Sequence, residues 1–377
     1  MAVNKDREKI RDLITNVLKK KKTPLMIIKK QSLIDQYNRF KACFPKVHPY
    51  FSVKANPHPE IIRIFAELGS GFDAASAEEI NWVTANGGKS KDIIYANTIK
   101  PAAHIKRAKA KKISTMTFDN QLELKKIAEN FPGADVVLRI RATNLGSVIE
   151  LSLKFGAEAN QTLPLLIKAR KLGLNPVGVS FHVGSQCTNH ETHAEALEIS
   201  AEIFRECAAH RIKLSLLDIG GGFPIKHFER DAHPVIEDLA VLINTEISRL
   251  FPEDIKIIAE PGRFFVGPAG ILVTRVIGKS FRNEMNYYYL DDGVYQDFSG
   301  VIFDHCKYEY KTLKKGRKYL SILAGPTCDS FDTIAVGVEL PNLKIGDIVY
   351  VENIAAYSSA TAVHGFNGYR PAEVILL

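Results

Sequence analysis

Short β-rich runs alternate with helical segments from about residue 30 to residue 260, and this alternation limits the folds open to the chain. The β-rich runs cover residues 49–54, 71–73, 93–95, 113–118, 136–140, 176–182, 214–219 and 255–260. Apolar residues at helical spacing fill segments between them, such as 59–68, 77–85, 121–130 and 191–210. Alternating strands and helices predict a parallel sheet, and eight such units predict a closed (β/α)8 TIM-like barrel rather than an open sheet.

The pattern changes after Pro261. Short strands are predicted at 271–277, 287–290, 318–323 and 347–351, separated by Gly-Pro, Asn-Gly and Gly-Asp turns, which is typical of an all-β domain. The first twenty residues predict an amphipathic helix, and we expect this segment to pack with the β domain. We therefore predict a barrel over residues 25–262 and a β-sandwich or β-barrel domain over 263–377 together with 1–24.

The composition is that of a globular protein, with 46% hydrophobic residues among 377. The five cysteines have irregular spacings without a CxxC pair, which indicates neither a metal site nor a disulfide framework and favours a reduced, cytoplasmic setting. The charged N-terminus lacks the apolar run of a signal peptide. The sequence contains no stretch of about 18 apolar residues, so we predict no membrane span.

The net charge of +8 does not by itself predict a nucleic-acid partner. Basic residues concentrate at 19–22 and 106–112, and neither run alternates with the aromatic residues that stack on bases. We interpret both runs as solvated faces and expect no nucleic acid and no membrane among the partners.

Polar residues or glycine stand at the ends of six of the apolar runs. In a parallel barrel these positions share one rim, which is where barrel enzymes carry their chemistry. We therefore expect a common site formed by Lys54, Asp73, Arg139, His182, Gly220 and Glu260.

Taken singly, these positions allow ordinary structural roles as well as chemical ones. Lys54 is either a surface lysine or a desolvated amine able to form a Schiff base. The glycine-rich loop 217–224 is either a tight turn or a nest of N–H groups for phosphate, and it fits neither a Walker loop nor a dinucleotide fingerprint. Glu260 and Arg263 form either an ion pair or partners for a pyridine nitrogen and a phosphate. His182 is either a core residue or a flat ring stacked on an aromatic cofactor.

Eight motifs, taken in order, are more specific than any one of them. They read PYFSVKAN, GSGFDAASAEEI, FHVGSQ, LDIGGGFP, EPGRFF, DDGVY, GPTCDSFD and FNGY. This series resembles the fold-type III decarboxylases that use pyridoxal 5'-phosphate (PLP) to act on ornithine, lysine, arginine or diaminopimelate. It is most similar to the eukaryotic-type ornithine decarboxylases. The resemblance implies an alanine-racemase-like fold, in which a PLP-binding (β/α)8 barrel is followed by a C-terminal all-β domain.

The resemblance also implies a role for each site residue. Lys54 would hold PLP as a Schiff base, Asp73 would lie beside it, and His182 would stack on the cofactor ring. Glu260 would face the pyridine nitrogen, and Arg139 would support the charge network. The phosphate would be held by Ser185, Gly220, Gly221, Gly222, Gly262, Arg263 and Tyr357.

The substrate side is likewise implied by the resemblance. Cys328 would be the acid that protonates the carbanion left after CO2 departs, since a thiol is a plausible donor. Asp304 and Asp329 would meet the distal ammonium of the substrate, with Tyr295 and Phe366 beside them. The resemblance further implies a head-to-tail homodimer with shared sites, in which Cys328 and Asp329 are contributed in trans and a Lys154–Asp332 pair bridges the subunits.

The expected reaction is decarboxylation of L-ornithine to putrescine. An arginine for a distal carboxylate, as diaminopimelate would need, does not stand beside Asp304. Lysine, which would give cadaverine, differs from ornithine by one methylene, worth about 1–3 kcal/mol. Another basic amino acid therefore stays open as the substrate.

Two departures and two alternatives accompany this interpretation. Ala355 replaces the glycine that precedes the Ala-Tyr pair in the family, and the segment before Phe366 is one residue longer.

One alternative is a non-catalytic homologue of the antizyme-inhibitor kind; the basic stretch 96–124 resembles the antizyme-contacting region, and we interpret it as a solvated helix face. The other is an alanine racemase, in which the Gly-Pro-Thr-Cys-Asp motif is not expected.

Overall fold

The structure is a computed structural model, and it describes residues 2–142, 146–147, 154–227 and 235–377. The chain divides into two compact units. The barrel unit comprises Leu33–Ile225 and Ala232–Phe265, and the β unit comprises Met1–Ser32, Lys226–Asp231 and Val266–Leu377. Among the described residues, no helix is both long and apolar enough to cross a membrane.

The barrel unit confirms the predicted parallel barrel. Strands β2 to β9 pair in sequence order, each parallel to the next, and β9 closes the barrel by pairing with β2. The strands are β2 (Val47–Ser52), β3 (Gly71–Ala74), β4 (Ile93–Tyr95), β5 (Thr115–Phe118), β6 (Asp135–Arg139), β7 (Asn175–Ser180), β8 (Leu216–Asp218) and β9 (Lys256–Ala259). The register pairs Ser52 with Asp73 and Arg139 with Ser180, which brings the carboxyl ends of the strands to one rim.

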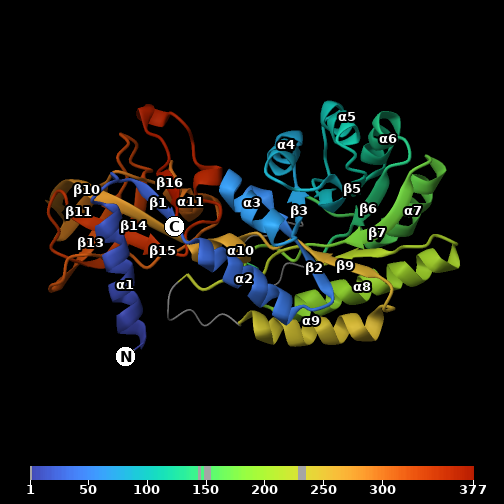
Figure 1. The fold of residues 1–377 in the computed structure, drawn as a ribbon, viewed down its shortest axis with the longest axis horizontal. Coiled ribbons are helices and arrows are strands. Elements are labelled where there is room, and N and C mark those ends of the chain that lie inside the picture. The colour runs from blue at the N-terminus through green and yellow to red at the C-terminus, as the bar shows by residue number, and fades with distance from the viewer. Residues whose placement is uncertain (1, 143–145, 148–153, 228–234) are drawn as a thin grey trace. The chain divides into compact units, whose positions relative to one another are not determined.

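Helices cover the outside of these strands (Figure 1). They are α2 (Lys30–Cys43), α3 (Pro59–Glu67), α4 (Ala77–Ala85), α5 (Ala102–Ala110), α6 (Gln121–Asn130), α7 (Thr162–Lys171), α8 (His190–Ala209) and α9 (Ile236–Leu250). Four of them begin after a residue whose side chain accepts a hydrogen bond from the first turn: His58, Ser76, Asn120 and Asn189. Each cap fixes the residue at which its helix begins, because it satisfies N–H groups that have no partner inside the helix.

An aromatic cluster fixes the chain just beyond β9. Phe265 stacks on Phe65 with ring centroids 5.0 Å apart, and it meets Phe40 edge-on at 5.6 Å. All three rings are fully buried. The two phenylalanines that follow Arg263 in the EPGRFF motif therefore anchor the turn on which Arg263 stands.

The β unit is built on one curled sheet in the order β12–β15–β10–β11–β13–β14; β1 pairs with β10, and β16 pairs with β1. Its strands are β1 (Leu25–Ile28), β10 (Gly270–Arg282), β11 (Met285–Leu290), β12 (Lys311–Thr312), β13 (Lys318–Ala324), β14 (Thr333–Pro341), β15 (Ile348–Glu352) and β16 (Glu373–Leu376). Helix α1 (Ala2–Val17) packs on this sheet through Ile14, which lies against Ile27 and Val273.

Strand β1 corrects the boundary that we placed at residue 25. Its four residues are fully buried, and they pair with β10 on one side and β16 on the other, so β1 belongs to the sheet and not to the barrel. An apolar run of four residues carries no sign of which sheet it joins, because any buried strand has this composition.

The basic stretch 96–124 needs a second correction. Lys106, Arg107 and Lys109 are exposed as expected, but the Lys100 side chain is fully buried. It pairs with the buried carboxylate of Glu123 at 3.1 Å and donates to the carbonyl of Thr117 at 2.6 Å. Burial lowers the pKa of Lys100 to about 8, and Glu123 partly offsets this effect. Lys100 precedes α5 and lies in the interior, whereas the solvated face begins with the helix itself.

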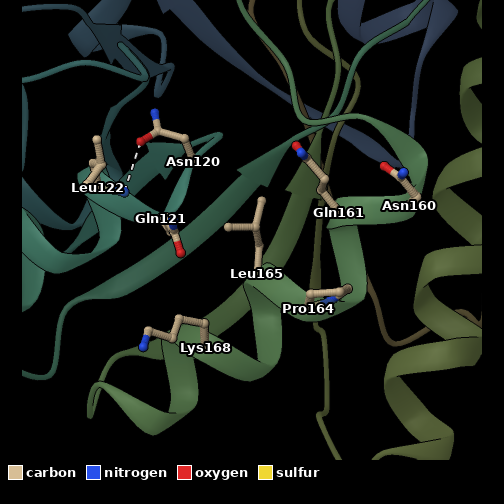
Figure 2. A pocket seen from close by; sticks show the side chains of 8 residues that line it. All are labelled: Asn120, Gln121, Leu122, Asn160, Gln161, Pro164, Leu165 and Lys168. Carbon is tan, nitrogen blue, oxygen red and sulfur yellow. Dashed lines mark hydrogen bonds between the residues drawn. The ribbon is translucent and has the colours of Figure 1, made fainter.

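A pocket of about 640 Å³ lies between the N-terminal parts of α6 and α7, on the helix layer (Figure 2). It is lined by Asn120, Gln121, Leu122, Asn160, Gln161, Pro164, Leu165 and Lys168. No predicted site residue is among them, so this pocket is separate from the candidate active site.

Candidate active site

Lys54 lies in a short turn (η1, Val53–Ala55) directly after β2, and its Nζ donates a hydrogen bond to Asp73 Oδ2. The side chain of Asp73 is fully buried, whereas that of Lys54 is 41% exposed. Ser52 Oγ donates to the same carboxylate at 2.7 Å. The sequence-predicted pair of Lys54 and Asp73 is thus brought together, and Ser52 orients the carboxylate.

Two further acids lie in the same barrel interior. Asp218, at the end of β8, shares a side-chain hydrogen bond with Glu260, which follows β9. Burial is the main reason that the pKa of Asp218 is raised to about 7 and that of Glu260 well above its ordinary value. The charge of Asp218 raises the pKa of Glu260 further, whereas the hydrogen bond with Glu260 lowers the pKa of Asp218. The proton of the pair at neutral pH is therefore held by Glu260.

Arg139 provides the compensating charge from the end of β6. Burial lowers the pKa of its guanidinium, while Glu260, Asp218 and Asp73 oppose that effect. The guanidinium carbon lies 5.3 Å from the ring centroid of Phe155, a cation–π distance. Arg139 therefore interacts with the three buried acids of the barrel interior, Asp73, Asp218 and Glu260.

His182 follows β7, and its Nδ1 accepts a hydrogen bond from the backbone N–H of Gly184 at 3.0 Å. Desolvation, with the charges of Arg139 and Lys54, holds its pKa well below the ordinary value. The ring is therefore neutral at pH 7, and the bond at Nδ1 assigns the proton to Nε2. Nε2 lies near the glycine loop, because a Cβ on Gly221 would stand 3.1 Å from it.

Two loops after β7 and β8 pack tightly enough to explain their glycines. A Cβ at Gly220 would stand 2.1 Å from the carbonyl oxygen of Phe181, and one at Gly222 would stand 2.3 Å from that of Gly184. Both glycines also have positive φ angles, of 65° and 96°. The glycine run therefore serves close packing between loops and leaves its N–H groups near the rim.

The Ser185 hydroxyl lies at the same place, since it accepts a hydrogen bond from Arg263 Nη2 at 3.3 Å. Gly262 accepts at its carbonyl from the N–H of Phe265, which closes the turn carrying Arg263. Hydroxyl, guanidinium and backbone N–H groups are the donors that phosphate prefers. The sequence-predicted phosphate residues of the barrel unit thus come together.

The β unit gathers four of the remaining predicted residues. Tyr295 donates a hydrogen bond from its hydroxyl to Asp329 Oδ2, and its ring stacks on Phe366 at 4.3 Å. The bond raises the pKa of Tyr295 and lowers that of Asp329. Cys328, which is exposed, donates its backbone N–H to Asn367 Oδ1 at 2.9 Å.

Asp304 and Tyr357 stand elsewhere in the β unit. Asp304 ends the helix α11 (Gly300–Phe303), and Tyr357 follows β15 with a positive φ of 52°. Ala355, the departure noted above, is fully buried against Gly270 of β10, where a Cβ would stand 2.4 Å from that of Ala355. A glycine on the facing strand thus makes room for the extra methyl group of Ala355.

Asp332 has a clear structural role inside its own unit. It is 2% exposed and accepts hydrogen bonds from the N–H of Val294 at 2.8 Å and from the hydroxyl of Thr327 at 2.8 Å. It thereby ties the Cys328–Asp329 turn to the turn before Tyr295. The bridging pair of Lys154 and Asp332 stays a prediction.

The barrel residues fit PLP on their own geometry. Asp73 Oδ1 is a buried oxygen without a hydrogen-bond partner among the described residues, which suits a site that receives a ligand carrying N–H or cationic groups. One amine, one protonated acid pair, one neutral imidazole and a set of phosphate donors surround the same rim. This combination defines a PLP enzyme built on a parallel barrel.

Comparison with known proteins identifies the family. The pyridoxal binding domain of the pyridoxal-dependent decarboxylases matches residues 30–267. The chain therefore belongs to this family, and its cofactor is PLP.

The chain is 38% identical to a lysine/ornithine decarboxylase from Selenomonas ruminantium, over 96% of this chain and 92% of the relative. It is 39% identical to antizyme inhibitor 2 from Xenopus laevis, over 91% and 78%. The structure of SrLDC with PLP and cadaverine gives a TM-score of 0.91 at 36% identity, over 97% of this chain and 93% of the other. The arginine decarboxylase of Paramecium bursaria Chlorella virus gives 0.92 at 32% identity, over 97% and 100%.

Asp218, Ser52 and Gln186 were not among the residues predicted for the site. Asp218 precedes the glycine run, and its position at a strand end was a usable signal. Ser52 and Gln186 resemble ordinary polar residues, and only their hydrogen bonds place them at the site.

The raised pKa of Asp218 makes the cofactor-free protein sensitive to pH. An acid whose pKa rises on folding favours the folded state below its unfolded pKa, near 4, and this contribution disappears as pH passes its folded value of about 7. Against Asp218→Asn, the wild type should lose stability between about pH 4 and 7, by on the order of 1 kcal/mol per pH unit. Urea unfolding across this range measures the difference, and parallel curves would contradict the assignment.

Proposed function

We propose that this chain uses PLP to decarboxylate a basic amino acid, with conversion of L-ornithine to putrescine as its main reaction. The observation that carries the proposal is the contact between Lys54 Nζ and Asp73, in a barrel that also holds the protonated pair of Asp218 and Glu260. The family supports decarboxylation, since its members named above act on lysine, ornithine or arginine.

The barrel residues bind and orient the cofactor. PLP, when bound, supplies the electron sink that makes loss of CO2 possible. Lys54 provides the amine that holds it, and Asp73 keeps that amine positioned. Glu260 holds a proton facing the ring nitrogen, with Asp218 as its partner. His182 offers an uncharged ring face that stacks without repelling a cationic pyridine.

The phosphate would be held by the donors already described, with Tyr357 added from the β unit. Ser185 and Arg263 share a hydrogen bond, so one ligand oxygen can accept from both side chains. The glycine run from Gly220 to Gly222 adds backbone N–H groups.

On the substrate side, the proposal assigns roles to β-unit residues. Asp304 and Asp329 would meet the distal ammonium, and Asp329 keeps a lowered pKa because Tyr295 donates to it. A carboxylate held ionised in this way can pair with a cation. Phe366, stacked on Tyr295, would shield that end of the substrate from water.

A homodimer with shared sites is part of the proposal. The β unit exposes several large apolar side chains, which in a soluble partner-free protein are usually scattered and few. They include Phe303, Leu320, Phe331 and Val336, each at least 56% exposed. Phe331 follows the Cys328–Asp329 turn by two residues, so burying it in a subunit interface would bring this turn to the partner.

A binding protein without activity is the second candidate, and it rests on the similarity to an antizyme inhibitor. The presence of Lys54, Glu260, Arg263 and Cys328 together favours the enzyme, because a protein that only binds a partner has no chemical use for a cofactor site. Lysine is the main competing substrate, since one relative is a lysine/ornithine decarboxylase.

Release of CO2 from ornithine, lysine, arginine and diaminopimelate, measured side by side, tests the proposal. We expect ornithine to give the highest kcat/KM, with lysine lower by roughly 10- to 200-fold for one methylene. Arginine or diaminopimelate in first place would show that Asp304 does not set the substrate. Absence of CO2 from all four, in protein that binds PLP, would favour the binding protein.

A further inference from the structure

Gln186 follows Ser185 directly, and its backbone adopts a conformation that side-chain-bearing residues rarely take. Its φ angle is +55°, in the left-handed region where glycine and asparagine are the common residues. The side chain is nevertheless 95% buried, since only 5% of the residue is exposed. A long amide held in this way indicates that the side chain itself makes contacts the fold requires.

Both ends of the Gln186 amide are bonded to the same residue of the next loop. Nε2 donates to the carbonyl of Ile225 at 3.0 Å, and Oε1 accepts from the N–H of Ile225 at 2.8 Å. The amide thus reproduces the paired bonds of two adjacent strands, without a strand being present. Both atoms are buried, so removing the amide leaves two backbone groups without partners.

Ile225 lies in the same loop as the glycine run, three residues after Gly222. The clamp therefore joins the loop of Ser185 to the loop of Gly220–Gly222. Ser185 stands on one side of it and Gly220–Gly222 on the other. A backbone bond from the N–H of Cys187 to the carbonyl of Gly222, at 2.9 Å, runs beside the clamp. The facing backbones are already too close for a side chain at Gly222.

We propose that Gln186 is a positioning residue, which clamps the loop after β7 to the loop after β8 and so fixes the spacing of the donors that grip the PLP phosphate. The inference rests on the proposed placement of the phosphate between Ser185, Arg263 and the glycine run. Gln186 itself is assigned no contact with the cofactor, because both ends of its amide are bonded to Ile225.

The test compares two ligands on the cofactor-free full-length chain. PLP and pyridoxal both react with Lys54, but only PLP carries the phosphate. Their dissociation constants are measured by titration of the visible absorption of the bound ligand. We expect Gln186→Ala to weaken PLP binding about tenfold and to leave pyridoxal binding within about twofold, because the clamp acts on the phosphate end.

Gln186→Asn separates the clamp from backbone strain. Asparagine tolerates the left-handed conformation better than glutamine but is one methylene too short to reach Ile225. The clamp predicts the same loss of PLP affinity as in Gln186→Ala. Unchanged affinity in a folded Gln186→Asn variant would overturn the proposal and leave only a conformational preference at this position.

Asn244→Ala serves as the matched control. Asn244 also donates a side-chain amide N–H to a backbone carbonyl, that of Cys43 at 2.7 Å, but between α9 and the end of α2. It should lower stability without changing the ratio of PLP to pyridoxal affinity. An equal change in that ratio would mean that the Gln186 effect is general destabilisation.

Arg263→Gln distinguishes failure of the inference from failure of the phosphate site. If Arg263→Gln weakens PLP but not pyridoxal while the Gln186 variants bind both normally, the clamp is wrong and the site stands. If Arg263→Gln weakens both ligands equally, the phosphate does not lie beside Arg263. The proposed phosphate site and the clamp are then both wrong.

Discussion

Replacing Lys54 by alanine should reduce decarboxylation by more than about a thousandfold and abolish the visible absorption of the bound cofactor. The size of the effect follows from the role of the amine, because no other side chain of the described rim can form the covalent link to PLP. Asp73 would also lose its cation, and its buried carboxylate would keep only the bond from Ser52. The measurement is CO2 release by the purified variant, together with its absorption spectrum in the presence of PLP.

Lys54→Arg is the matched control for the charge. Arginine keeps a cation beside Asp73, but its guanidinium is not a nucleophile at accessible pH. It should restore the stability lost in Lys54→Ala without restoring turnover or the absorption band. Turnover by either variant near the wild-type rate would remove Lys54 from the mechanism, and a colourless wild type would support the binding protein instead.

The barrel was predictable because its signal is repeated. Eight apolar runs alternate with helical segments, so an error at one boundary does not change the fold class. The strand-end residues were predictable for the same reason, since every parallel strand presents its carboxyl end to one rim. Lys54, Asp73, Arg139, His182 and Glu260 all lie there in the structure.

Single polar residues were harder to place, because their role depends on contacts distant in sequence. Lys100 belongs to a basic stretch that indicates a solvated face, yet a carboxylate 23 positions away makes its burial tolerable. Gln186 gives no sequence signal for its bonds to Ile225, which stands 39 positions later. Composition describes the average neighbour of a residue, whereas burial of a charge or an amide depends on one particular partner.

Cys328→Ala should lower kcat by roughly 10²- to 10⁴-fold, the usual contribution of a positioned acid or base. Affinity for PLP should stay unchanged, because Cys328 is not among the residues proposed to hold the cofactor. The loop should keep its shape, since the bond from Cys328 to Asn367 uses the backbone N–H, which any residue retains. A lowered kcat with normal cofactor binding would therefore be due to loss of the thiol itself.

The fate of the proton distinguishes an acid from a residue that only fills space. If Cys328 delivers the proton to the substrate carbon, its removal leaves that proton to come from a less well placed donor, and some of it should reach the wrong atom. The variant should then release more CO2 than it forms diamine, whereas the wild type should produce the two in equal amounts. Cys43→Ala is the control, because burial raises the pKa of this thiol and it lies at the end of α2, outside the proposed site. Equal amounts of CO2 and diamine at the wild-type rate in Cys328→Ala would assign the protonation to another group.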